Sequence, residues 1–146
     1  MMIGLLKKQD IDEFVAMSTV FYTMPACAYS VPATHFYNTA EYCLTHPTDY
    51  VVLVIEVENT LAGYCSLALS YSTEAGGKHV QIDEIYIKDE HQGQGLGKKL
   101  FDHIYAHYPA KRYRLESTQS NQRAIKLYKT LGFKELGYVQ LILDKE

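Results

Sequence analysis

A glycine-rich turn between a strand pattern and a helix pattern constrains this chain more than any other feature of its sequence. The turn spans 92–97 (QGQGLG) and places three glycines within five positions. The β-branched and aromatic residues of 80–87 before it suit a buried strand. After it, Leu96, Leu100 and Ile104 recur at the spacing of one helix face. Glycines let the backbone turn sharply and aim several N–H groups at one point. The sequence therefore predicts a strand, a glycine turn and a helix.

The start of this helix is a candidate anion site, because a helix N-terminus carries about half a positive charge and several unpaired N–H groups. Two common phosphate-binding loops are excluded by register. The dinucleotide pattern needs glycine at Lys98, and the Walker pattern needs glycine at Gln92 and Ser or Thr at Lys99. The pattern that fits is [QR]-x-x-G-x-[GA], through Gln92, Gly95 and Gly97. A purely structural glycine turn is the alternative.

Composition favours one compact domain, residues 1–146, with a small partner. A chain of 146 residues with 47% hydrophobic content can bury a sizeable core. A net charge of −3 argues against nucleic acid, which usually requires a basic excess. Cys27, Cys43 and Cys65 are too few and too scattered for a disulfide framework or a metal site, and favour reduced thiols in a cytoplasmic protein. No apolar run approaches the ~18 residues of a membrane span.

Periodicity along the chain predicts an α/β domain with a mixed sheet. Strands are expected over 2–6, 50–57, 61–71, 80–87 and 113–117, with one or two more across 133–144, and helices over 10–22, 33–44, from 96 and from 121. The second and third of these strands should form a hairpin. The strand, helix and strand around the glycine turn favour parallel pairing of 80–87 with 113–117.

A second motif lies in the last of these helices. Residues 121–133, NQRAIKLYKTLGF, match N-x-x-A-x-x-x-Y-x-x-x-G-F at every specified position. With both motifs in this order, the chain resembles the GNAT superfamily of acyl-CoA-dependent N-acetyltransferases over 81–133. The runs DEIYI at 83–87 and NQRA at 121–124 look most like diamine (polyamine) acetyltransferases.

The resemblance implies a single-domain GNAT-like fold, with a mixed, mostly antiparallel central sheet flanked by about four helices. It implies acetyl-CoA as co-substrate, a small amine as acceptor and a possible homodimer. The backbone of 85–87 would bind the acetyl and pantetheine groups, 92–98 the pyrophosphate, and Asn121 the pantetheine arm. Gln92 stands where many relatives carry arginine, so it adds no charge. The implied cofactor-binding residues are Ile85, Tyr86, Ile87, Gln92, Gly93, Gln94, Gly95, Leu96, Gly97, Lys98, Asn121, Ala124 and Tyr128.

Acetyl transfer to an amine requires a base, because an alkyl amine with a pKa near ~10.4 is protonated at neutral pH. Asp83 and Glu84 are the candidates. On a regular strand they point to opposite faces, so at most one is expected to face the acceptor. Tyr128 lies near the thioester sulfur by resemblance and suits the acid that protonates the leaving thiolate. The alternatives are solvated carboxylates and a core tyrosine.

Three functions remain open. The first is an N-acetyltransferase for small amines, the second a peptide or protein N-acetyltransferase, and the third an acyl-CoA-binding module without turnover. Retention of Tyr128 and both carboxylates favours turnover. The aromatic side chains within 21–42 could line an acceptor pocket or pack in the core. No metal site is expected.

Overall fold

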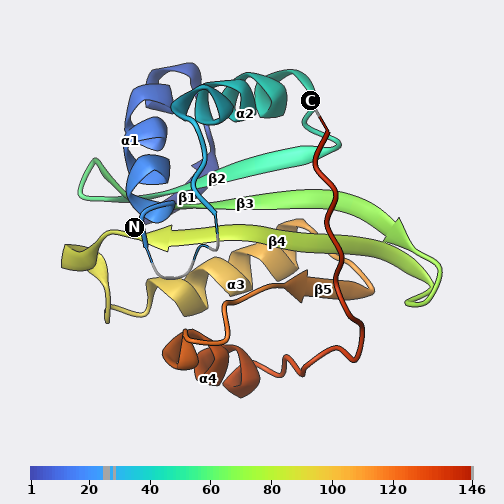
Figure 1. The fold of residues 1–146 in the computed structure, drawn as a ribbon. Coiled ribbons are helices and arrows are strands. Elements are labelled where there is room, and N and C mark those ends of the chain that lie inside the picture. The colour runs from blue at the N-terminus through green and yellow to red at the C-terminus, as the bar shows by residue number, and fades with distance from the viewer. Residues whose placement is uncertain (25–26, 28, 146) are drawn as a thin grey trace.

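The chain folds around one five-stranded sheet in the order β1-β2-β3-β4-β5 (Figure 1). The computed structural model describes residues 1–24, 27 and 29–145. The strands are β1 (Met2–Leu5), β2 (Tyr50–Val57), β3 (Thr60–Ser72), β4 (Gly77–Ile87) and β5 (Arg112–Leu115). The helices are α1 (Ile11–Phe21), α2 (Ala33–Thr45), α3 (Leu96–His107) and α4 (Gln122–Thr130), with short 3-10 helices at Lys8–Asp10 and Asp89–His91.

Helices cover both faces of the sheet. In Figure 1, α1 and α2 lie on one face and α3 and α4 on the other. Each face has its own apolar cluster, and β2 contributes alternate residues to the two: Val52 and Val54 pack toward α1 and α2, and Val51 and Leu53 toward α3. A strand buried on both faces must be apolar throughout, which explains its unbroken hydrophobic run.

Pairing within the sheet is mostly antiparallel, as predicted. β1, β2, β3 and β4 pair antiparallel in succession, and only β4 and β5 pair parallel. The hairpin of β2 and β3, the parallel β5 and the four helices confirm the sequence-based expectations, with shifts of a few residues at element ends. No helix of the described ranges is long and apolar enough to cross a bilayer.

A β-bulge interrupts the pairing of β3 with β4. Ser66 lies opposite Glu84 and Leu67 opposite Ile82, which leaves Asp83 as an extra residue in β4. A bulge of this kind shifts the alternation of side chains by one position. It therefore changes which face the residues after Asp83 occupy.

The predicted strands across 133–144 are wrong for the described part of this segment. Phe133 packs into the cluster under α3, but residues 134–145 form no strand and are exposed. The apolar alternation of the segment is real, but a strand also needs a neighbour to satisfy its backbone groups. In this structure none of the five strands provides one.

Gly63 in β3 should be indispensable for the close approach of β4. A Cβ at this position would meet the Tyr86 carbonyl oxygen at 2.3 Å, whereas a Cβ at Gly4 in β1 would meet nothing within 4 Å. We expect Gly63→Ala to lower the free energy of unfolding by about 1–3 kcal/mol, the usual cost of overpacking. Urea unfolding measures the loss, with Gly4→Ala as the matched control. Equal stability of the two variants would contradict the expected clash.

Candidate active site

The pairing of β4 with β5 ends partway along β4, which leaves the rest of that strand edge open. Their ladder ends at Ile82 and Leu115, so among the described residues 83–87 of β4 have no strand on that side. The Tyr86 carbonyl faces β3, because a Cβ on Gly63 would touch it. Alternation therefore directs the backbone groups of Ile85 and Ile87, rather than those of Tyr86, toward the open side. An extended ligand can add there as a strand would.

Gln92 closes part of this open edge. Its side-chain amide donates to the Ile87 carbonyl at 3.0 Å and to the Asp89 carboxylate at 3.3 Å. The side chain thus fastens the glycine turn to the end of β4.

The glycine turn presents free amides at the start of α3. Gly93 and Gly95 both have φ of 76°, a left-handed conformation that favours glycine, and Gly95 is the N-cap of the helix. Within the described part of the chain, the backbone N–H groups of 93–98 donate to no acceptor. Lys98 pairs with Asp102 at 3.2 Å on an exposed surface, so solvent and the carboxylate both weaken the effect of its charge. The backbone amides are therefore the main groups that could bind an anion at this turn.

Asp83 and Glu84 lie on the same face of the sheet, contrary to the expectation from a regular strand. Ile82 before the bulge and Ile85 after it both pack on the α3 side, which leaves the two acidic residues between them on the α1 and α2 side. The physical reason is the extra residue at Asp83, which cancels one step of alternation. Both carboxylates therefore face the same space.

Three tyrosine hydroxyls hold these carboxylates. Tyr22 at the end of α1 and Tyr64 of β3 both donate to Glu84, the second at 2.9 Å. Tyr50 at the start of β2 donates to Asp83 at 2.8 Å. The Tyr64 side chain is fully buried, so one side of Glu84 is enclosed by protein.

Burial distinguishes the two acids electrostatically. Asp83 is exposed, whereas Glu84 is partly buried. Burial raises the pKa of Glu84, the hydrogen bonds from Tyr22 and Tyr64 oppose that rise, and the negative charge of Asp83 adds to it. A carboxylate with a raised pKa is a stronger base than an ordinary glutamate, which suits Glu84 to proton transfer.

Tyr128 lies on the opposite side of the sheet, against the apolar cluster under α3. It lies on α4 and packs against Phe101 and Phe133, with ring centroids 6.3 Å and 6.2 Å away. Burial, with a smaller contribution from Cys65, raises the pKa of Tyr128, which keeps its hydroxyl protonated. No described residue accepts a hydrogen bond from that hydroxyl. It is therefore available to a ligand.

Asn121 begins α4 as predicted. Its side-chain oxygen accepts a hydrogen bond from the Ala124 N–H at 3.3 Å, so the amide of Ala124 is already used. The NH₂ group of Asn121 makes no hydrogen bond with another described residue.

Sequence reasoning found the acids but missed most of the groups that hold them. Tyr22 belongs to the aromatic segment proposed to line an acceptor pocket, and it does contact Glu84. The sequence alone does not indicate a role for Tyr50 and Tyr64, because that role arises only when β2, β3 and β4 pair. No group of three or more potential metal ligands occurs among the described residues.

Comparison with known proteins identifies the family. The chain matches the Acetyltransferase (GNAT) family model over residues 14–133. Since the match covers most of the chain, the protein belongs to the GNAT family of acetyltransferases. The fold agrees: a solved structure of AAC(6')-Iy, in complex with the bisubstrate analog CoA-S-monomethyl-acetylneamine, has a TM-score of 0.80 and 13% identity, with 99% of this chain and 97% of that chain covered.

Curated relatives include enzymes with different acceptors. Thialysine N-epsilon-acetyltransferase of Sus scrofa is 33% identical over 79 residues, 52% of this chain. The chain spans only 46% of that relative's length. A putative [ribosomal protein bS18]-alanine N-acetyltransferase of Bacillus subtilis is 32% identical over 135 residues, which cover 90% of this chain and 80% of the relative.

Ionisation of Glu84 should make the fold less stable as pH rises. Because the pKa of Glu84 is raised, the folded protein keeps a proton over a pH range in which the unfolded chain has lost it. The stability from that protonated carboxyl is complete below the unfolded pKa and is lost as pH rises through the folded pKa. Relative to wild type, Glu84→Gln should therefore gain stability from about pH 4 to about pH 7 in urea titrations. The exposed Glu41→Gln is the control, and a gain that shrinks with pH would refute the expectation.

Proposed function

We propose that this protein, as a single domain of residues 1–146, transfers the acetyl group of acetyl-CoA to a primary amine of a small cationic molecule. The observation that carries the proposal is the gap between β4 and β5, with Glu84 on one face of the sheet and Tyr128 on the other. A thioester in that gap would have a base on one side and an acid on the other.

The cofactor-binding groups fit acetyl-CoA, the co-substrate of the family. The free amides of 93–98 at the start of α3 suit a pyrophosphate. The backbone groups of Ile85 and Ile87 on the open side, of which the Ile87 carbonyl accepts from Gln92, suit the amides of the pantetheine arm and the acetyl carbonyl. The NH₂ group of Asn121 can donate to the same arm, because its oxygen alone is needed to cap α4.

Glu84 and Tyr128 would have different roles in proton transfer. Acetyl-CoA supplies an acetyl group activated as a thioester. Glu84 accepts a proton from the acceptor ammonium, so that the neutral nitrogen can attack the thioester carbon. Tyr128 donates a proton to the sulfur as the C–S bond breaks, and the proton that the attacking nitrogen then loses restores the phenol, so that the products are the amide and the free CoA thiol. The Asp83 carboxylate lies on the exposed side of the pair, where it can contact a cationic acceptor.

The acceptor site favours a small cationic amine. Two carboxylates and three tyrosines gather on one face, and aromatic rings and acids both attract ammonium groups. The thialysine acetyltransferase is a relative whose name gives a small-molecule amine as acceptor. A peptide N-terminal amine is the second candidate, supported by the longer match to the bS18-alanine acetyltransferase.

A screen of acceptors with acetyl-CoA, followed by free thiol release, tests the function directly. Small amines should be turned over faster than a peptide with an N-terminal alanine. We expect Glu84→Gln to lower turnover on the best amine by about 10²-fold, the usual contribution of a general base, with the affinity for acetyl-CoA preserved. Glu41→Gln serves as the control. Absence of thiol release with every amine and peptide would favour a binding module instead.

Gly95 should be essential for binding acetyl-CoA. Its φ of 76° disfavours any side chain, so a valine there should distort the backbone that aims the amides of the turn. We expect Gly95→Val to weaken binding more than about tenfold, which is 1.4 kcal/mol. Calorimetry measures the affinity. Gly76→Val is the matched control, because Gly76 has φ of 79° and equally open surroundings but lies in the β3–β4 turn. Equal affinities of the two variants for acetyl-CoA would show that the cofactor does not bind at the glycine turn.

Tyr128 should affect the reaction rate rather than binding. Tyr128→Phe keeps the ring packing and removes only the proton donor, which stabilises the sulfur mainly in the transition state. We expect turnover to fall about 10²-fold, with little change in the acetyl-CoA dissociation constant. Tyr105→Phe, another ring against Phe101, is the control. An unchanged rate would assign Tyr128 to the core alone.

A further inference from the structure

Two serine hydroxyls lie in the core without a hydrogen-bond partner among the described residues. They belong to Ser18 of α1 and Ser66 of β3, and both side chains are 0% exposed. A hydroxyl gives up its hydrogen bonds with water on burial, so an unpaired one in a dry core destabilises the fold. Two such groups beside the candidate site therefore require an explanation.

Ser18 faces Tyr64, one of the tyrosines that hold Glu84. On α1 it shares a helix face with Phe14 and Phe21, and both of those rings pack against the Tyr64 ring, with centroids 5.0 Å and 6.3 Å away. Burial and the charge of Glu84 raise the pKa of Tyr64, whereas the nearby Ser18 hydroxyl lowers it. The Tyr64 proton is directed to Glu84 at 2.9 Å, so the Tyr64 oxygen can only accept from Ser18.

Ser66 repeats this arrangement with the other acid. It lies opposite Glu84 in the β3–β4 pairing and opposite Val52 in the β2–β3 pairing, with Tyr50 on the same side of β2 as Val52. Burial and the charge of Asp83 raise the pKa of Tyr50, and the Ser66 hydroxyl lowers it. Tyr50 in turn donates to Asp83 at 2.8 Å. Each acid therefore has a tyrosine in contact with it and a buried serine behind that tyrosine.

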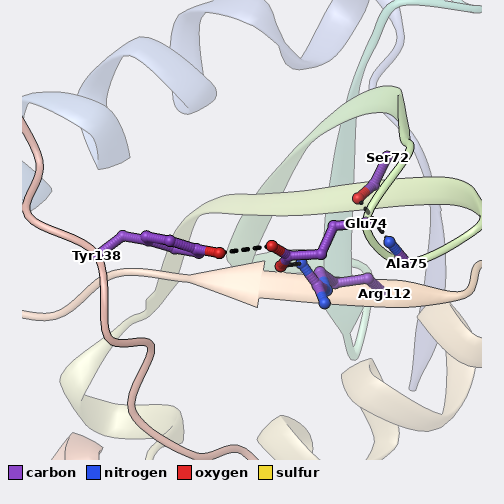
Figure 2. Close-up of polar contacts among 5 residues, drawn as sticks. All are labelled: Ser72, Glu74, Ala75, Arg112 and Tyr138. Carbon is purple, nitrogen blue, oxygen red and sulfur yellow. Dashed lines mark hydrogen bonds and ion pairs between the residues drawn. The ribbon is translucent and has the colours of Figure 1, made fainter.

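Glu74 in the β3–β4 turn shows how a carboxylate is held where a cation is present. It accepts from the Tyr138 hydroxyl at 2.6 Å and pairs with Arg112 at 2.6 Å (Figure 2). The hydrogen bonds from Tyr138 and then Arg112 lower the pKa of Glu74. Ser72 has a different role there, because its hydroxyl accepts from a backbone N–H of the turn at 3.0 Å. No described lysine, arginine or histidine pairs with Glu84, so hydroxyl groups must hold its carboxylate.

We propose that Ser18 and Ser66 are positioning residues for the two acids: each donates to a tyrosine oxygen and thereby holds the hydroxyl of that tyrosine on the carboxylate. For Glu84 the donors run from Ser18 through Tyr64 to the acid. A donor at the tyrosine oxygen makes the tyrosine itself a stronger donor, and the effect is greatest when the carboxylate is charged. The consequence for catalysis rests on the proposed role of Glu84 as the base.

The groups that can titrate near Glu84 come from several elements. The pKa of each tyrosine and thiol among them is raised, chiefly by burial, so none of these titrates in the range of a carboxyl. Asp83 must be followed together with Glu84, because its charge raises the pKa of Glu84. The groups are Tyr22 at the end of α1, Cys27 after it, Tyr50 of β2, Tyr64 and Cys65 of β3, and Asp83 of β4.

Carbon-13 NMR of the side-chain carboxyls in the full chain tests the proposal without any turnover. We expect Ser18→Ala to raise the pH midpoint of the Glu84 titration by about 0.5 units. Ser66→Ala should instead move the Asp83 titration more than that of Glu84. Ser72→Ala is the matched control and should move neither, because its hydroxyl serves the β3–β4 turn. Ser18→Ala should stay folded, since it removes an unpaired buried hydroxyl and places alanine in a helix.

The tyrosine between serine and acid provides a second test. In Tyr64→Phe the connection is absent, so adding Ser18→Ala should shift the Glu84 midpoint no further. An unmoved midpoint in Ser18→Ala would overturn the proposal, and so would a shift of the same size with and without the Tyr64 hydroxyl.

The pH profile of kcat/KM reports on the function separately. Its acid limb should move upward in Ser18→Ala by the same amount as the Glu84 midpoint. A moved carboxyl titration with an unmoved rate profile would support the role of Ser18 and refute Glu84 as the base.

Discussion

The bulge at Asp83 is the constraint on which the candidate site depends. Without the extra residue, Asp83 and Glu84 would lie on opposite faces of β4, and only one could face α1 and α2. The bulge also comes one residue after Ile82, where the ladder with β5 ends. One local irregularity therefore coincides with the start of the open edge and places both acids beside it.

The two faces of the sheet contribute different chemistry to this opening. The face under α1 and α2 supplies Glu84, enclosed by tyrosine hydroxyls and the ring of Tyr64. The face under α3 and α4 supplies Tyr128 in an aromatic setting. Because both faces are covered by helices, each group sits in a partly apolar environment, where burial can shift a pKa.

Local sequence patterns predicted the elements and the glycine turn well, because those features depend on neighbouring residues. The glycines of 92–97 and the apolar periodicity after Leu96 determine the local backbone conformation by themselves. Gly95, for example, has the left-handed conformation of the residue that begins α3. The bulge, the roles of Tyr50 and Tyr64, and the course of 133–145 could not be predicted in this way. The bulge and the roles of the two tyrosines depend on partners distant in the chain. Residues 133–145 have the apolar alternation of a strand, but none of the five strands lies beside them to pair with.

The side chain of Gln92 occupies the Ile87 carbonyl, one of the groups that an extended ligand would need. A ligand group that approaches that carbonyl from the side of Gln92 would displace the amide, and the displaced side chain belongs to the turn proposed to bind the pyrophosphate. Intact acetyl-CoA would incur the free-energy cost of displacing Gln92 only once, although binding of both its thioester end and its phosphate end depends on it. Fragments carrying only the phosphate end or only the thioester end would then bind with free energies that do not sum to that of the intact ligand. With acetyl-CoA bound as proposed, Gln92 would therefore couple recognition of the two ends.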